Sequence, residues 1–128
     1  MIGYVMLGSN DLDRAERFYT ELLAPLGLTR NAQFTSPTRR WFWTGRLDQP
    51  MFVLASPYDE KPATVGNGSM IALQAPSQAE VDRAHATALK LGGRDEGGPG
   101  DRGGGFYGAY VRDLDGNKLC VFHFGSGA

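Results

Sequence analysis

Side chains that serve as metal ligands or nucleophiles are scarce in this chain. Its 128 residues include two histidines, His85 and His123, and one cysteine, Cys120. The histidines lie far apart in the sequence and form no H-x₃-H or H-E-x-x-H pattern. A single cysteine excludes an internal disulfide and any zinc site built from three or four cysteines. The composition therefore argues against a metal centre rich in histidine or cysteine.

Each of these three residues has a packing interpretation beside its chemical one. His85 shares the apolar side of a predicted helix with Val81 and Ala88, which favours a core histidine over a catalyst. His123 falls on the helix-facing side of the last predicted strand, where we expect a hydrogen bond at the rim of the core. Cys120 has no histidine or helix start beside it in the sequence, so an inert packed thiol is favoured over a nucleophile.

Two glycine-containing patterns resemble ligand loops but occur in the wrong context. Residues 98–103 match G-x-G-x-x-G, yet they follow a helix and precede a strand, the reverse of a dinucleotide-binding fingerprint. Residues 113–124 begin like a calcium loop, but the glycine comes too early and Phe124 replaces the final glutamate, so we predict a turn. The glycine-rich segment 97–105 is predicted to be a mobile loop that gates a ligand.

Three arginines are the candidate anion-binding residues. Arg102 lies in the glycine-rich segment, and Arg39 and Arg40 precede the pair Trp41 and Trp43. For each arginine taken alone, a solvated surface charge is favoured over a role in ligand binding.

The charge balance limits the partners. With 13 Lys and Arg against 14 Asp and Glu, the formal net charge is −1, which provides no field for nucleic acid or an acidic membrane. No apolar stretch approaches the ~18 residues that a membrane span needs, and polar residues from Ser9 onward interrupt the first apolar run, unlike a signal peptide. One unpaired cysteine is typical of a reducing cytoplasm. We therefore expect a cytoplasmic protein with no nucleic-acid partner and no membrane partner.

Hydrophobic spacing predicts a strand, a helix and three further strands in the first half. The strand is residues 2–8, Asn10 is the expected N-cap, and Leu12–Leu23 repeats apolar side chains at helical spacing. Pro25 and Gly27 end the helix. The three strands are predicted at residues 28–35, 39–44 and 51–56.

The same order of elements returns in the second half. A strand is predicted at 69–75, Ser77 and Glu80 form a capping box at a helix start, and Gly92-Gly93 ends that helix. After the glycine-rich loop, strands are predicted at residues 106–112 and 118–124.

The repeat divides one domain into two modules, residues 1–57 and 69–128, joined by a linker at 58–68. Neither module can bury a helix and a sheet well alone, so the two are expected to share a core. The predicted fold class is α+β: two tandem βαβββ modules that form a curved mixed sheet with an apolar trough.

This duplicated plan resembles the vicinal oxygen chelate superfamily, which contains glyoxalases, extradiol dioxygenases and bleomycin-resistance proteins. The likeness is carried by the first strand running into Ser9-Asn10-Asp11-Leu12, by Phe18-Tyr19, by Phe106-Tyr107, and by the closing run from Arg112 to Leu119. That closing Asp-x-Asp-Gly-Asn-Lys-Leu is characteristic of the superfamily but of no particular activity. The resemblance covers nearly the whole chain.

The resemblance also implies four metal-ligand positions, and this chain departs from the pattern at all of them. The histidine expected on the first strand of each half is replaced by Tyr4 and Met70. The glutamate expected on the last strand is Cys120, and the strand Met51–Ala55 contains no donor. We therefore expect no metal and no cofactor.

Strand alternation places apolar side chains on a sheet face that does not contact a helix. In the trough that the resemblance implies, this face would line a ligand pocket, whereas plain core or dimer-interface packing explains it equally well. The predicted pocket residues are Tyr4, Met6, Trp41, Trp43, Met70, Ala72, Tyr110, Cys120 and Phe122.

Three functions follow from these observations. The first is a metal-free small-molecule-binding protein, with a homodimer implied by the bleomycin-resistance branch. The alternative is a metal-dependent enzyme of the glyoxalase type, a lyase, isomerase or dioxygenase, in which a metal polarises the substrate. The third is an interaction module without a ligand. No catalytic residue is assigned, because Tyr4, Tyr107 or Tyr110 would need a strongly perturbed pKa to act as an acid or base.

Overall fold

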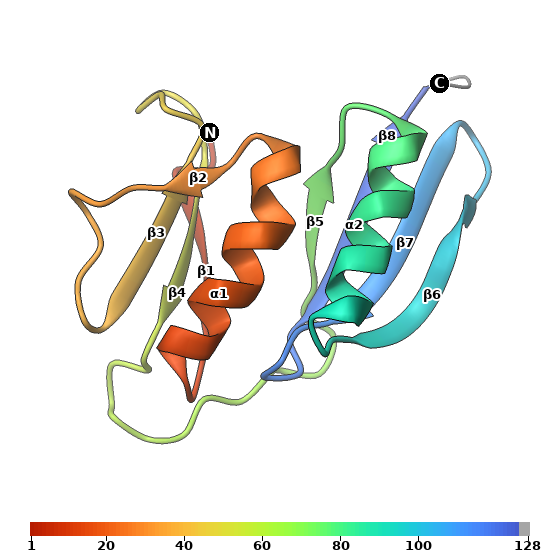
Figure 1. Cartoon of the computed structure of the whole chain (residues 1–128). Coiled ribbons are helices and arrows are strands. Elements are labelled where there is room, and N and C mark those ends of the chain that lie inside the picture. The colour runs from red at the N-terminus through yellow and green to blue at the C-terminus, as the bar shows by residue number, and fades with distance from the viewer. Residues whose placement is uncertain (126–128) are drawn as a thin grey trace. The chain divides into compact units, whose positions relative to one another are not determined.

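The computed structural model describes residues 1–125 and confirms the α+β class with two tandem βαβββ modules. The chain divides into two compact units, residues 1–65 and the part that begins at Gly66. Each unit has one helix lying across one face of its own sheet (Figure 1).

Unit 1 has a four-stranded mixed sheet in the order β1-β4-β3-β2. β1 and β4 are parallel, and the other neighbours are antiparallel. The parallel pair requires a crossover, which the helix α1 provides. The elements are β1 (Tyr4–Gly8), α1 (Leu12–Leu23), the short 3₁₀ helix η1 (Ala24–Leu26), β2 (Thr29–Arg30), β3 (Arg39–Trp43) and β4 (Met51–Ala55).

The sequence predicted Asn10 as the N-cap of α1, but the structure shows Asp11 in that role. The Asp11 carboxylate accepts a hydrogen bond from the Arg14 backbone N–H at 3.1 Å. The apolar spacing correctly predicts the buried face of the helix, although Tyr19 was not part of that repeat. Tyr19 is fully buried, and its ring contacts that of Phe52 with centroids 4.9 Å apart. The helix buries Leu12, Ala15, Phe18, Tyr19, Leu22 and Leu23.

The predicted strand 28–35 is only two residues long, because Asn31 turns the chain. Asn31 is buried, and its side-chain oxygen accepts a hydrogen bond from the Phe34 N–H at 3.0 Å. Its backbone oxygen accepts another from the Thr35 N–H at 3.1 Å. A short amide side chain that bonds to nearby backbone groups in this way competes with strand pairing.

Unit 2 repeats the plan with a mixed sheet in the order β5-β8-β7-β6, in which β5 and β8 are parallel. The cap of α2 is as predicted, because the Ser77 hydroxyl accepts a hydrogen bond from the Glu80 N–H at 3.2 Å. The elements are β5 (Ile71–Gln74), α2 (Gln78–Lys90), β6 (Arg94–Asp101), β7 (Phe106–Arg112) and β8 (Lys118–Phe124).

The prediction of a gating loop at 97–105 is wrong over its first half. Residues up to Asp101 belong to β6, which pairs antiparallel with β7. The register shifts between Asp95 and Gly97 and again between Gly97 and Gly100. Glycine has a low β propensity, and in a strand it often marks a bulge. The residues of β6 therefore pair with β7 through their backbone, with an irregular register.

The segment Asp113–Asn117 forms a turn, as predicted. The buried Asp113 carboxylate accepts hydrogen bonds at 2.9 Å from the backbone N–H groups of Asp115 and Asn117. The Asn117 side chain donates a further hydrogen bond to the same carboxylate at 3.0 Å. These contacts fix the β7–β8 connection and use this carboxylate for structure.

Substituting Gly93 with alanine is expected to destabilise the protein by about 1–3 kcal/mol, because the site is closed by backbone. A Cβ at this position would lie 2.8 Å from the Arg112 carbonyl oxygen and 2.9 Å from that of Ala88. Gly98 is the matched control, since a Cβ there meets nothing within 4 Å. Urea unfolding should show the loss in G93A and a change below about 0.5 kcal/mol in G98A. Equal midpoints for the two variants would contradict this account.

Candidate functional site

The sheet of unit 1 has one face covered by α1 and one that is not, here called the helix-free face of unit 1. Alternation along β1 and β3 places Tyr4, Met6, Trp41 and Trp43 together on it, as predicted. Tyr4 and Met6 are 52% and 41% exposed. The Tyr4 and Trp41 rings meet edge to face, with centroids 4.8 Å apart. An exposed aromatic surface is thus assembled from two strands.

A cleft of about 630 Å³ opens in unit 1 where β1 and β4 end and β3 begins. A neighbouring cleft of about 390 Å³ reaches Met6 on the helix-free face, and the two share Arg39 and Tyr58. Of the predicted site residues, Met6 and Arg39 line these clefts, whereas Tyr4, Trp41 and Trp43 do not. The larger cleft is lined by Ser9, Asn10, Thr38, Arg39, Ser56, Pro57, Tyr58, Glu60, Lys61 and Pro62.

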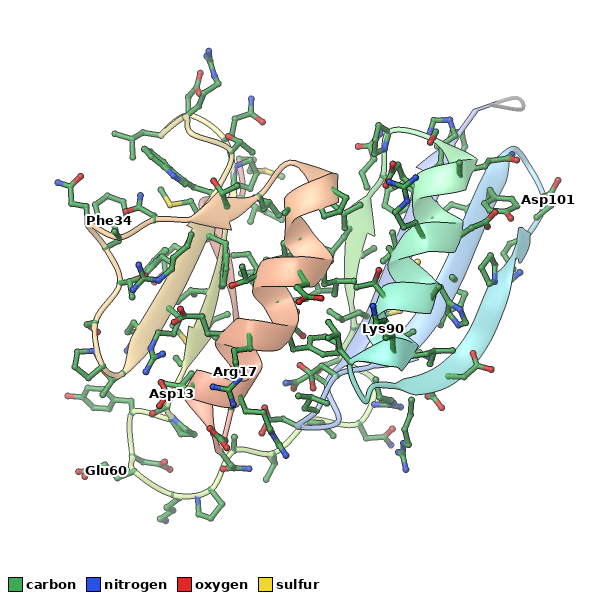
Figure 2. All side chains as sticks on the ribbon, in the orientation of Figure 1. Asp13, Arg17, Phe34, Glu60, Lys90 and Asp101 are labelled. Atoms are coloured by element: carbon green, nitrogen blue, oxygen red, sulfur yellow. The ribbon has the colours of Figure 1, made fainter. Side chains whose placement is uncertain are left out.

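The wall of both clefts is the loop after β4, residues 57–64, which is fastened to the start of α1. The Asn10 side-chain oxygen accepts a hydrogen bond from the Ala63 N–H at 2.7 Å, and its amide donates to the Ala63 oxygen at 3.3 Å. A Cβ on Gly8 would lie 3.0 Å from that of Ala63, so glycine permits the close approach. Glu60 marks this loop in Figure 2. Much of the segment expected to be a linker therefore builds the cleft.

The two neighbouring arginines of β3 have different roles because adjacent strand residues face opposite sides. Arg40 points to the helix and pairs with Glu16 at 2.8 Å and Asp13 at 3.0 Å. The hydrogen bond that Arg40 donates to the Glu16 carboxylate raises the pKa of Arg40. Its charge is already neutralised, so Arg40 is unavailable to a ligand on the other face. Arg39 lines the clefts and forms no ion pair within residues 1–125.

The helix-free face of unit 2 carries Ala72, Tyr110, Cys120 and Phe122, as strand alternation predicts. Cys120 pairs in register with Ala72 on one side and Tyr110 on the other. The Phe122 ring stacks on Phe106 with centroids 5.1 Å apart. Met70 precedes β5, so strand parity does not place it, and it is 46% exposed.

Cys120 is buried beneath a basic and aromatic group. Its exposed fraction is 1%, and burial raises the pKa of its thiol, opposed by a hydrogen bond with Tyr110 and by the charges of Arg102 and Lys118. The Arg102 guanidinium carbon and the Lys118 ammonium nitrogen each lie 5.5 Å from the centre of the Tyr110 ring. Sequence reasoning missed Lys118, although it has the same strand parity as Cys120.

The histidines and Tyr107 have structural partners on the helix-facing side, which agrees with their packing interpretation. His85 contacts the Asp95 carboxylate at 3.0 Å and lowers the pKa of Asp95. His123 contacts the Ala75 carbonyl oxygen at 3.1 Å. The Tyr107 hydroxyl donates to Asp82 at 2.6 Å, which raises the pKa of Tyr107.

Two tandem βαβββ units, each with one helix on a mixed sheet, define a duplicated α+β class of protein. The family model of the Glyoxalase/Bleomycin resistance protein/Dioxygenase superfamily matches residues 1–121. The chain belongs to this superfamily.

Solved structures agree with that assignment. A glyoxalase/bleomycin resistance protein from Albidiferax ferrireducens T118 is 36% identical, with a TM-score of 0.87 over 98% of this chain and 99% of that one. A lactoylglutathione lyase from Agrobacterium tumefaciens is 26% identical, with a TM-score of 0.69 over 96% and 92%. A family enzyme from Burkholderia phytofirmans PsJN, at 16% identity and a TM-score of 0.76 over 95% and 97%, shows the shared fold. A comparison with curated proteins gave no match.

The positions that the family resemblance assigns to metal binding hold Tyr4, Met70 and Cys120. These residues make a poor donor set for a hard divalent cation, which prefers oxygen or imidazole donors. Tyr4 is exposed, Met70 offers a thioether, and burial favours the protonated thiol of Cys120. In the part of the chain that the structure describes, no group of three or more His, Cys, Asp or Glu could hold a metal ion. Among the same residues, no helix is long and apolar enough to cross a membrane.

Replacing Asn10 with alanine is expected to release the cleft wall while leaving the core intact. Removing both hydrogen bonds to Ala63 should speed hydrogen exchange of the Ala63 amide by about tenfold. Asp59→Ala is the control within the same loop, because Asp59 accepts a hydrogen bond from the Lys61 N–H and does not contact Ala63 through one. Unchanged exchange at Ala63 in N10A, measured by NMR, would show that the contact does not hold the loop.

The Cys120 thiol is expected to react slowly in the native protein, since only the thiolate attacks and burial raises its pKa. At pH 8 a disulfide reagent should modify native protein on the order of tenfold or more slowly than protein unfolded in urea. Absorbance of the released thiol measures both rates. Equal rates would mean that Cys120 is exposed or activated.

Proposed function

We propose that this chain binds a small organic molecule on the helix-free face of unit 1 without the help of a metal ion. The observation that carries the proposal is the exposure of Tyr4 and Met6 on one sheet face, where Met6 reaches a cleft that contains Arg39. Large apolar side chains gathered on the surface of a sheet favour binding, because water contact with them is unfavourable. The cleft of about 630 Å³ has the size of a small-molecule site.

The chemistry of this surface suggests what the ligand offers. Tyr4 and Trp41 present ring surfaces, which favour an apolar or planar group. Arg39 and Lys61 line the larger cleft together with hydroxyl groups such as that of Ser56, which favours a polar end with hydrogen-bond acceptors. An amphipathic organic molecule satisfies both parts.

We propose binding without a metal because of the residues at the positions that the resemblance assigns to metal ligands. Tyr4, Met70 and Cys120 replace two histidines and a glutamate that the family resemblance assigns to metal binding, and β4 supplies no donor. The name of the relative from Albidiferax ferrireducens includes both glyoxalase and bleomycin resistance. Of these two roles, binding of the bleomycin-resistance type does not require the metal ligands that this chain has replaced.

A lyase of the glyoxalase type is the second candidate. It is favoured by the 26% identity to the lactoylglutathione lyase from Agrobacterium tumefaciens. Such an enzyme would need donors other than those at the family positions, and no residue of this chain is assigned as catalytic.

Purified protein is expected to contain far less than one transition-metal ion per chain by elemental analysis. In a thermal-shift screen of amphipathic compounds, a binder should raise Tm by roughly 5 °C or more at 100 times its Kd, with or without EDTA. Met6→Lys should abolish that shift because it places a charge on the apolar surface. Leu47→Lys is the control, because Leu47 is 69% exposed and lines neither cleft.

Two results would contradict the proposal. One is a stoichiometric zinc, nickel, iron or manganese ion in the purified protein. The other is turnover of the hemithioacetal of glutathione and methylglyoxal that appears when nickel or zinc is added, which would establish the lyase.

The assembly and location complete the proposal. The homodimer implied by the family and the cytoplasmic location indicated by the single cysteine stay predictions, as does the expectation of no nucleic-acid or membrane partner.

A further inference from the structure

Two cations of unit 2 lie against the same tyrosine ring, from both neighbouring strands. Arg102 follows β6 and Lys118 begins β8, while Tyr110 lies in β7 between them. Each charged group is 5.5 Å from the centre of the Tyr110 ring. Arg102, Tyr110 and Lys118 are here called the basic cluster.

Most hydrogen-bond donors of the basic cluster are unused within residues 1–125. The Arg102 guanidinium, with five N–H groups, donates one hydrogen bond, to the Gly98 oxygen at 2.7 Å. The Lys118 ammonium makes a cation–π contact and no ion pair there. Charged donors that lack an acidic partner suit a ligand that brings its own negative charge.

The acidic residues of β6 do not neutralise these cations because each has another partner. Asp95 contacts His85 on the helix side at 3.0 Å. Glu96 pairs with Arg112 at 2.9 Å. Asp101 accepts a hydrogen bond from the Gly103 N–H at 2.7 Å.

Glycines in β6 make room for the Arg102 side chain over the sheet. A Cβ at Gly100 would lie 2.8 Å from an Arg102 guanidinium nitrogen. A Cβ at Gly97 would lie 3.1 Å from the Tyr110 ring and 3.4 Å from the other guanidinium nitrogen. A side chain at Gly100 would therefore displace the guanidinium, and one at Gly97 would crowd the Tyr110 ring. This accounts for glycines in a strand that they otherwise weaken.

We propose that the basic cluster binds the oxyanion of an organic acid, a carboxylate or a phosphate group. Arg102 and Lys118 supply charged N–H donors, and the Tyr110 ring contacts both cations. The cluster lies on the helix-free face of unit 2, with Cys120 buried beneath it. This site lies within unit 2, and the inference goes beyond the small-molecule binding proposed for unit 1 without depending on it.

The test is an NMR titration of labelled protein with three probes: benzoate, inorganic phosphate and the neutral benzamide. Benzoate or phosphate should shift the ring signals of Tyr110 in a saturable manner, and benzamide should not. The acid that binds more tightly identifies the oxyanion class as carboxylate or phosphate. Binding should weaken as salt rises, because the contacts are ionic.

Arg102→Gln and Lys118→Gln should each weaken binding of that probe by about tenfold, because each removes a charged donor. Tyr110→Phe keeps the ring and should weaken it less. Arg83→Gln is the matched control, since Arg83 lies on α2 of the same unit, is exposed, and pairs with Glu80. Its affinity should stay within about twofold of the unchanged protein. Thermal unfolding checks that every variant is folded.

Three outcomes would overturn the inference: no saturable response to either anion, an equal response to benzamide, or equal weakening by R83Q and R102Q. These outcomes are distinct from a failure of the proposed function. A stoichiometric metal would overturn metal-free binding yet leave the probe titration readable. If the protein is metal-free and binds only uncharged compounds, the proposed function stands, but the inference that the basic cluster binds an oxyanion is overturned.

Discussion

Each sheet in this protein has a single helix to cover it, and one helix covers one face. In unit 1, α1 buries Tyr19 against Phe52 of β4, and in unit 2, α2 buries Val81 and Ala88 on its own sheet. Side chains along a strand alternate between the two faces of a sheet. The residues between those that pack against the helix therefore make up the helix-free face. The cleft at Arg39 and the cations around Tyr110 both depend on this division, which also places His123 on the helix-facing side.

Alternation and spacing are local properties, and what depends on them could be predicted from the sequence. The strands at 106–112 and 118–124 have the predicted bounds, and the helix Leu12–Leu23 was also found. The face shared by Tyr4, Met6 and Trp41 follows from the same rule. The strand β6 could not be found in this way, because glycine carries no hydrophobic signal and its pairing is decided by the neighbouring strand. The role of Arg40 was within reach, since a strand cannot point both Arg39 and Arg40 toward one ligand.

The clefts of unit 1 could not be predicted, because they depend on a contact between residues 53 positions apart, Asn10 and Ala63. Asn10 has the residue type of a helix cap, and local rules assign it that role. Asp11, one residue later, is equally suited, and the structure uses it for the cap. Lys118 was missed for a different reason. The sequence places it in the predicted strand 118–124, but its position beside Tyr110 depends on the pairing of β8 with β7.

In the loop after β4, the residues that hold the loop in place differ from the residues that form the wall of the larger cleft. Asn10 and Ala63 hold the loop at its far end, and β4 holds it at the near end. The residues between them, from Tyr58 to Lys61, are exposed and bury nothing in the core. Exchanges at Tyr58 or Lys61 therefore remove no core packing, yet each would alter the wall of the proposed binding cleft. The contacts that hold this wall and the side chains that form it can change independently.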